Sequence, residues 1–150
     1  MTARPTLQSV AQRTTAIAVG VLIVDATSKA TALFLAARNY GHEIILPAEN
    51  PDFSLGVASA ALPIMVILSS LGILVFGGYT TWAATGGVVP VWVPGLLIGG
   101  AVGNLADRLF FGAVHDWLEL GKVVVNLGDL AVVAGLLGYF ASLAFAHRER

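Results

Sequence analysis

The chain has 150 residues, of which 57% are hydrophobic and 11% are charged, with a formal net charge of −1 and no cysteine. A soluble domain carries about 25% charged residues, so this composition argues against a soluble enzyme and favours a small integral membrane protein. The balanced charge gives no sign of nucleic-acid binding, and the absence of cysteine excludes disulfides, thiol catalysis and cysteine-based metal sites.

Four apolar stretches approach the length of about 20 residues that a membrane-spanning helix needs. We expect them to run from about Ala16 to Ala37, Ala58 to Phe76, Val88 to Ala106 and Leu127 to Ala146. The sequence has no convincing internal repeat and no low-complexity linker, so residues 1–150 are expected to form one domain. The predicted fold class is an all-α integral membrane protein, with four transmembrane helices and a small extracytoplasmic loop region.

The first stretch follows a basic start, as the apolar part of a cleaved signal peptide would. However, Asp25 and Lys29 interrupt it, and it is longer than the 7–15 or so apolar residues of such a peptide, so we expect a span. Asp25 and Lys29 are four residues apart with the acid first, which favours an ion pair on one helical face. We interpret the pair as an anchor of the bundle; alternatively, Asp25 could also steady a neighbouring loop.

The segment AENPDFSLGVASA joins the first two stretches. Pro51 and Asp52 indicate a turn, and Gly56 gives the backbone freedom before the second helix. The simplest interpretation is an ordinary loop that ends in a helix start. The alternative is that the side-chain amide of Asn50 holds the backbone of a substrate.

Three polar residues, Asn104, Asp107 and Arg108, close the third stretch. Asp107 and Arg108 could form a charge pair at the membrane interface, with Arg108 extended toward the lipid headgroups. Asn104 lies deeper and is expected to need a hydrogen-bonding partner. The spacing alone leaves open whether these residues take part in catalysis.

Two aspartates, Asp116 and Asp129, flank a short polar segment between the third and fourth stretches. A carboxylate near hydrocarbon is costly and is usually kept for a function. Two converging carboxyl groups can act as base toward water and acid toward a carbonyl, as in an aspartic protease. Alternatively, Asp129 could only favour the helix dipole after an N-cap at Asn126. The intervening loop, with Gly121 and Gly128, is long enough to bring both carboxyl groups together.

The motifs VDATSK, NPDFSLG, GNLADR followed by GAVHDW, and NLGD resemble those of the lipoprotein signal peptidase (signal peptidase II) family, in the same order. The resemblance covers nearly the whole chain. It implies an aspartyl protease, without metal or other cofactor, that removes the signal peptide from diacylglyceryl-modified prolipoproteins by cutting before the lipidated cysteine. The implied partners are these substrates, membrane lipids and globomycin-type inhibitors, and not nucleic acid.

Carried over position by position, the resemblance makes Asp116 and Asp129 the catalytic pair, which shares one proton. The residues that it implies shape or support the site are Asp25, Lys29, Asn50, Gly56, Asn104, Asp107, Arg108 and Asn126.

Several positions depart from the family pattern. The family usually has NxGxAFG where this chain has NPDFSLG, so Asp52 replaces a glycine and Leu55 a phenylalanine. Gly128 stands where alanine is usual, and His115 where valine is usual. These changes concern the substrate loop and the titration of the pair, whereas both aspartates are present.

Charged residues also predict the orientation in a bacterial cell membrane. Arginines lie at both ends of the chain, namely Arg4, Arg13, Arg148 and Arg150. With an even number of spans, the preference of basic residues for the inside places both termini in the cytoplasm. Most acids then fall on or near the outer side, where we expect the active site.

Two other functions are compatible with a small polytopic chain. The alternative function is a small ion- or proton-coupled membrane transporter, because intramembrane acids are common in that class. The lack of visible inverted repeats and the gathering of acids near one side argue against it. A structural membrane subunit would not need two acids with flanking asparagines.

Overall fold

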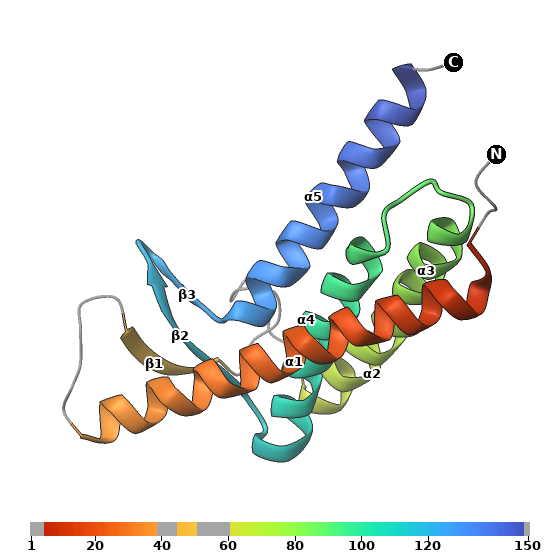
Figure 1. The fold of residues 1–150 in the computed structure, drawn as a ribbon. Helices are drawn as coiled ribbons and strands as arrows, with labels where there is room; N and C mark the ends of the chain where they lie inside the picture. Colours follow the sequence, from red (N-terminus) through yellow and green to blue (C-terminus); the bar gives the residue numbers. More distant parts are fainter. Residues whose placement is uncertain (1–4, 39–44, 51–60, 149–150) are drawn as a thin grey trace.

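The computed structural model describes residues 5–38, 45–50 and 61–148. Its elements in chain order are α1 (Leu7–Ala37), β1 (Ile45–Asn50), α2 (Leu62–Gly72), the π-helical turn η1 (Ile73–Gly77), α3 (Gly78–Thr85), α4 (Trp92–Phe111), β2 (Val114–Leu120), β3 (Val123–Val125) and α5 (Leu127–Arg148). The strands gather where α1 ends and α5 begins, whereas the start of α1 and the end of α5 lie at the opposite end of the molecule (Figure 1).

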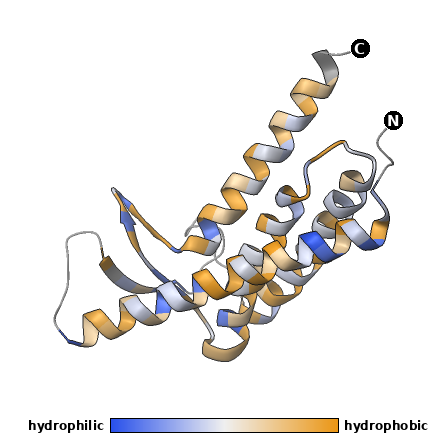
Figure 2. Cartoon of the chain, viewed as in Figure 1, coloured by the Kyte–Doolittle hydropathy of each residue, from blue (hydrophilic) through white to orange (hydrophobic). Residues whose placement is uncertain are grey.

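Within the described residues, three helices are long and apolar enough to cross a membrane, namely Leu7–Ala37, Leu62–Thr85 and Leu127–Ala146. Hydrophobic residues cover much of these helices (Figure 2), and large side chains such as Leu74 and Phe145 are exposed on them. The expected count of four spans is not confirmed, because α4 is not among the three within the described residues. Helix α4 carries the polar residues Asn104, Asp107 and Arg108 in its second half.

The expected limits of the first two stretches differ from those of the helices, and the third stretch, expected from about Val88 to Ala106, is a helix over Trp92–Phe111. The first helix begins at Leu7 instead of near Ala16, because the hydroxyl of Thr6 caps it by accepting from the backbone N–H of Ser9 at 3.2 Å. The second helix continues past Gly77 and Gly78 to Thr85, although its apolar stretch is expected to end near Phe76. Glycine is tolerated within membrane helices, and here it lies in or directly after a π-helical turn.

The expectation of an all-α fold is wrong, because three strands form a small sheet in the order β1-β2-β3. Both strand pairs are antiparallel, with Ala48 opposite Asp116 and Leu118 opposite Val125. Gly121 has φ of +70° in the tight turn between β2 and β3, a conformation that glycine adopts without strain. The segment that the sequence suggested as a polar loop is therefore mostly a hairpin.

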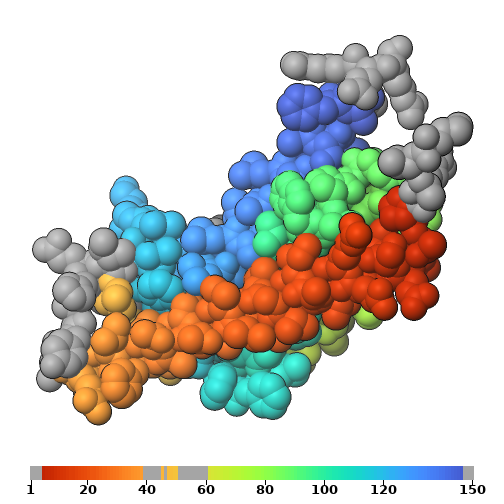
Figure 3. All heavy atoms as spheres, viewed as in Figure 1, coloured from red at the N-terminus to blue at the C-terminus, as the bar shows by residue number. Residues whose placement is uncertain are grey.

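Helix α4 lies between α1 and α5 and packs mainly on these two helices. Its glycines allow close approach: a Cβ at Gly99 would lie 2.7 Å from the carbonyl oxygen of Ala18, and one at Gly100 would collide with the carbonyl oxygen of Gly128. A buried apolar cluster that includes Val10, Val93 and Leu97 lies away from the sheet. Helix α1 covers one face of the molecule (Figure 3).

Candidate active site

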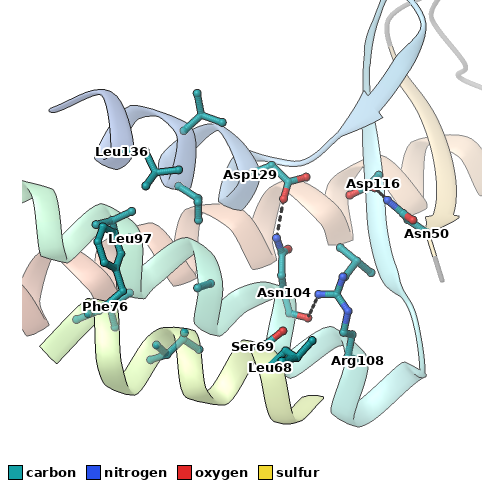
Figure 4. A pocket seen from close by; sticks show the side chains of 18 residues that line it. Asn50, Leu68, Ser69, Phe76, Leu97, Asn104, Arg108, Asp116, Asp129 and Leu136 are labelled. Atoms are coloured by element: carbon teal, nitrogen blue, oxygen red, sulfur yellow. Dashed lines mark hydrogen bonds between the residues drawn. The ribbon is translucent and has the colours of Figure 1, made fainter. Parts of the chain in front are cut away.

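A pocket of about 390 Å³ opens between the sheet and the helices. Its polar end is lined by Asn50 from β1, Asn104 and Arg108 from α4, Asp116 from β2 and Asp129 from α5. Its apolar part extends along α2, η1, α4 and α5, where Phe76, Leu97 and Leu136 line it (Figure 4). The pocket thus joins a carboxylate-containing end to a hydrophobic channel.

Asp116 is held by two amide side chains. Its Oδ2 accepts from Nδ2 of Asn50 at 2.9 Å, and its Oδ1 accepts from Nδ2 of Asn126 at 2.6 Å. The residue is 2% exposed. Burial raises the pKa of the Asp116 carboxyl above its usual value, while the hydrogen bonds from Asn50 and Asn126 oppose that rise. Asp116 can therefore hold a proton over a wider pH range than an exposed aspartate.

Asp129 lies in the first turn of α5 and faces the same pocket. Its Oδ1 accepts from Nδ2 of Asn104 at 2.7 Å. Its Oδ2 accepts from the backbone N–H of Asn126 at 3.3 Å, and its own backbone N–H donates to Oδ1 of Asn126 at 2.8 Å. The predicted N-cap at Asn126 is thus confirmed, and the same side chain also binds Asp116, so the cap links the two aspartates.

Behind Asp129 lies the Lys29 cluster, which consists of Asp25, Lys29, Asn104 and Asp107. Lys29 Nζ is 2.7 Å from Asp25 Oδ2 and 3.0 Å from Asp107 Oδ2. It also donates to Oδ1 of Asn104 at 3.1 Å. The predicted ion pair of Asp25 and Lys29 is therefore present. Asn104, which is expected to need a hydrogen-bonding partner, has two, namely Lys29 and Asp129.

Asp25 connects this cluster to the start of α5. Its Oδ1 accepts from the backbone N–H of Gly128 at 2.8 Å. A Cβ at Gly128 would lie 3.0 Å from Oδ1 of Asn126 and 3.1 Å from the carbonyl oxygen of Gly100, so an alanine here would require small shifts. This hydrogen bond to helix α1 therefore fixes the backbone of Gly128, the residue directly before Asp129.

Arg108 does not extend toward the lipid headgroups, so that interpretation is wrong. It is 7% exposed and lines the pocket, and its Nη1 donates to the carbonyl oxygen of Asn104 at 3.3 Å. Asp107 instead contacts Lys29, and it accepts from the backbone N–H of His115 at 3.0 Å. The close packing of α4 on α1 turns these charges inward.

Several features could not be found from the sequence. No sequence motif marks the residues of the apolar wall of the pocket. No motif predicts the hydrogen bond from Nε1 of Trp117 to Oγ of Ser28 at 3.2 Å either, which connects β2 to α1. Gly56, with Asp52 and Leu55, lies outside the described residues. The described residues hold no group of three or more His, Asp or Glu side chains placed to hold a metal ion.

The arrangement has the parts of a carboxyl pair that works on a bound chain. Asp116 and Asp129 come from different elements and line one pocket, and each accepts hydrogen bonds that fix its orientation. One ionised carboxylate can take a proton from water while a protonated partner polarises a carbonyl. The neighbouring channel can accept an apolar segment of substrate.

Comparison with known proteins agrees with this geometry. The family model described as signal peptidase (SPase) II matches residues 17–145. A lipoprotein signal peptidase of Syntrophomonas wolfei is 33% identical over 122 residues, covering 77% of this chain and 81% of that protein. One of Pelotomaculum thermopropionicum is 34% identical over 125 residues, covering 77% and 80%.

The fold is also similar to solved structures of bacterial membrane enzymes. One matches with a TM-score of 0.75 and 22% identity, covering 91% of this chain and 90% of that chain. A second matches with a TM-score of 0.69 and 23% identity, covering 87% and 91%. At these identities the likeness concerns the fold.

Proposed function

Because this chain belongs to the signal peptidase II family, whose members remove the signal peptide from prolipoproteins, we propose that it does so as an aspartic endopeptidase. Asp116 and Asp129 form the catalytic pair, and residues 1–150 act as one membrane-embedded peptidase domain. The observation that carries the proposal is the presence of both carboxyl groups, each oriented by asparagine donors, in one pocket. The substrate is a diacylglyceryl-modified prolipoprotein cut before its lipidated cysteine.

The pocket suggests how the substrate is held. The apolar part, between α2, η1, α4 and α5, accepts the hydrophobic signal segment. Asn50 and Arg108 stand beside the carboxyl pair, where they can bind backbone carbonyl groups of the extended peptide. The acyl chains stay in the bilayer, which explains why a lipidated substrate reaches the site laterally.

The chemistry needs one ionised and one protonated carboxyl group. The ionised member takes a proton from water, which attacks the scissile carbonyl carbon while the protonated member donates to the carbonyl oxygen. The proton that the first carboxylate gained then goes to the leaving amine as the peptide bond breaks. Two carboxyl groups that line the same pocket do not both ionise readily, because the two negative charges repel each other. The pair therefore shares one proton in the resting site.

Cleavage by the purified protein tests the proposal. We expect it to cut a diacylglyceryl-modified prolipoprotein to a signal peptide and a mature lipoprotein, and to leave the unmodified precursor intact. Globomycin is expected to block the reaction, because the resemblance implies that the family is its target. A folded preparation that leaves the lipidated precursor uncut, but moves protons across liposome membranes, would favour the transporter alternative, against which the family membership already argues.

We further propose that α4 is a fourth span and that both termini are cytoplasmic. Helix α4 packs between α1 and α5, two candidate spans, and the sheet end of the molecule lies opposite the ends of α1 and α5 that bear the terminal arginines (Figure 1). The sheet and the carboxyl pair are then at the outer face.

Because the chain has no cysteine, this topology can be tested with single introduced thiols. An impermeant maleimide added to intact protoplasts is expected to label Lys122→Cys in the exposed β2–β3 turn, and to label Gln8→Cys at the exposed start of α1 only after lysis. The reverse pattern would overturn the orientation. Labelling of both sites before lysis would contradict the even number of spans, unless the membranes leak. Labelling of a cytoplasmic marker protein in the same sample shows whether they do.

A further inference from the structure

His115 lies beside the Lys29 cluster and on the opposite face of β2 from Asp116, because successive side chains of a strand alternate. Its backbone N–H donates to Oδ2 of Asp107 at 3.0 Å, and its Nδ1 lies 3.6 Å from the same oxygen. That oxygen is also 3.0 Å from Nζ of Lys29. One carboxylate oxygen of Asp107 therefore faces both an ammonium group and an imidazole.

The surroundings of His115 contain several charges. Asp107 faces it from α4, and Lys29 and Asp25 of α1 lie behind Asp107. From β1, Glu49 is its partner in the strand register, which places both side chains on one face of the sheet. On its own strand the neighbouring charged residue is Asp116.

The imidazole can exchange protons with water. The side chain of His115 is 18% exposed, and its ring packs edge-on against Phe111 with 4.9 Å between centroids. Histidine is the side chain that ordinarily changes its charge between about pH 5 and 8. At the outer face, the proton would come from the external medium.

The charge of the Lys29 cluster depends on this proton. When His115 is neutral, the carboxylates of Asp25 and Asp107 exceed the single ammonium of Lys29 by one negative charge, which a protonated imidazole would cancel. The cluster is joined to the catalytic pair, because Lys29 donates to Asn104 and Asn104 donates to Asp129.

We propose that His115 is a positioning residue whose proton neutralises the Lys29 cluster and thereby extends cleavage by the aspartate pair toward acid pH. The proposal rests on the proposed function. The pair loses activity in acid when its ionised carboxylate becomes protonated, and added positive charge nearby favours the ionised form. Burial raises the pKa of the Asp116 carboxyl, and the ammonium of Lys29 already opposes that rise.

The test compares the pH dependence of cleavage in the full-length protein and two variants. His115→Val and His115→Gln both keep the backbone N–H that binds Asp107 and remove the titrating ring. The rate of cleavage of a lipidated prolipoprotein is measured from about pH 5 to about pH 9, the range that brackets histidine titration. Lys122→Ala, which removes an exposed cation from the β2–β3 turn, is the matched control.

Both variants are expected to match the wild-type rate above about pH 8, where the imidazole is ordinarily neutral. Their acid limb should move to higher pH by about half to one unit, so that on this limb they cleave roughly threefold to tenfold more slowly than wild type at the same pH. The control should keep the wild-type profile.

Two outcomes would overturn the inference while leaving the proposed function intact. One is a set of superimposable pH profiles, and the other is a loss of the same factor at every pH, which indicates a packing role for the ring. If the folded wild-type protein cuts at no pH, the proposed function fails and this inference with it. Unfolding temperatures of each variant in acid and in alkali show whether a lower rate reflects unfolding.

Discussion

Replacing either Asp116 or Asp129 by asparagine is expected to reduce cleavage of a lipidated prolipoprotein by about a thousandfold or more. Asparagine keeps the size of the side chain but cannot exchange a proton with water or with the scissile carbonyl. In the proposed mechanism the two carboxyl groups act as one unit, so the double variant should be no slower than either single variant. Cleavage by the purified variants, followed by gel shift of the substrate, measures the effect.

Measurements of folding and of substrate binding show whether a variant is inactive because it lacks the carboxyl group or because it is misfolded. Each variant should still fold and bind the lipidated precursor, because the pocket walls and Asn50 are unchanged. Glu119→Gln provides a matched control, since it removes a carboxylate from the same strand as Asp116 but outside the pocket. If Asp129 served only the helix end, Asp129→Asn would cost within about 1 kcal/mol of stability and keep its activity. Substantial turnover by either folded variant would refute the aspartate pair.

Replacing Lys29 by alanine is expected to have the largest effect on folding. The change removes the ammonium group that lies 2.7 Å from the buried carboxylate of Asp25 and 3.0 Å from the partly buried carboxylate of Asp107. Removing one partner of a buried ion pair typically costs about 3–5 kcal/mol, which corresponds to a fall in unfolding temperature of roughly 10 °C. Folded yield after detergent extraction and the thermal unfolding midpoint measure the loss.

An exposed lysine supplies the comparison. Lys122→Ala should change stability by less than about 0.5 kcal/mol, because surface substitutions remote from packed or paired groups usually do. If Lys29→Ala has normal yield and thermal stability but no activity, Lys29 acts on the substrate or in catalysis, and our structural interpretation is wrong.

The ion pair illustrates how far the sequence reaches. The four-residue spacing of Asp25 and Lys29 predicts their contact, because that contact lies within one helix. The convergence of Asn104 and Asp107 on the same ammonium depends on where α4 crosses α1. That crossing is set by contacts such as Gly99 against Ala18, which no local pattern announces.

The sheet and the second helix show where local sequence patterns predict the wrong secondary structure. Membrane composition favours helices alone, so the sequence predicts a loop where the short strands β2 and β3 lie. In the second helix, the sequence predicts an end near Phe76, directly before Gly77 and Gly78. The hydroxyls of Thr80 and Thr81 donate to the carbonyl oxygen of Gly77 at 3.1 and 2.7 Å, which helps the helix to continue.

The double use of Asn126 has a consequence for drug resistance. Its amide nitrogen binds Asp116 and its oxygen caps α5, so a substitution there that disturbs an inhibitor seated against Asp116 also removes the helix cap. Loss of such a cap costs about 1 kcal/mol, and it releases the turn that carries Asp129. A resistance substitution at Asn126 would therefore reduce both the stability of the protein and its activity. This makes the side-chain amide of Asn126 a favourable contact for an inhibitor.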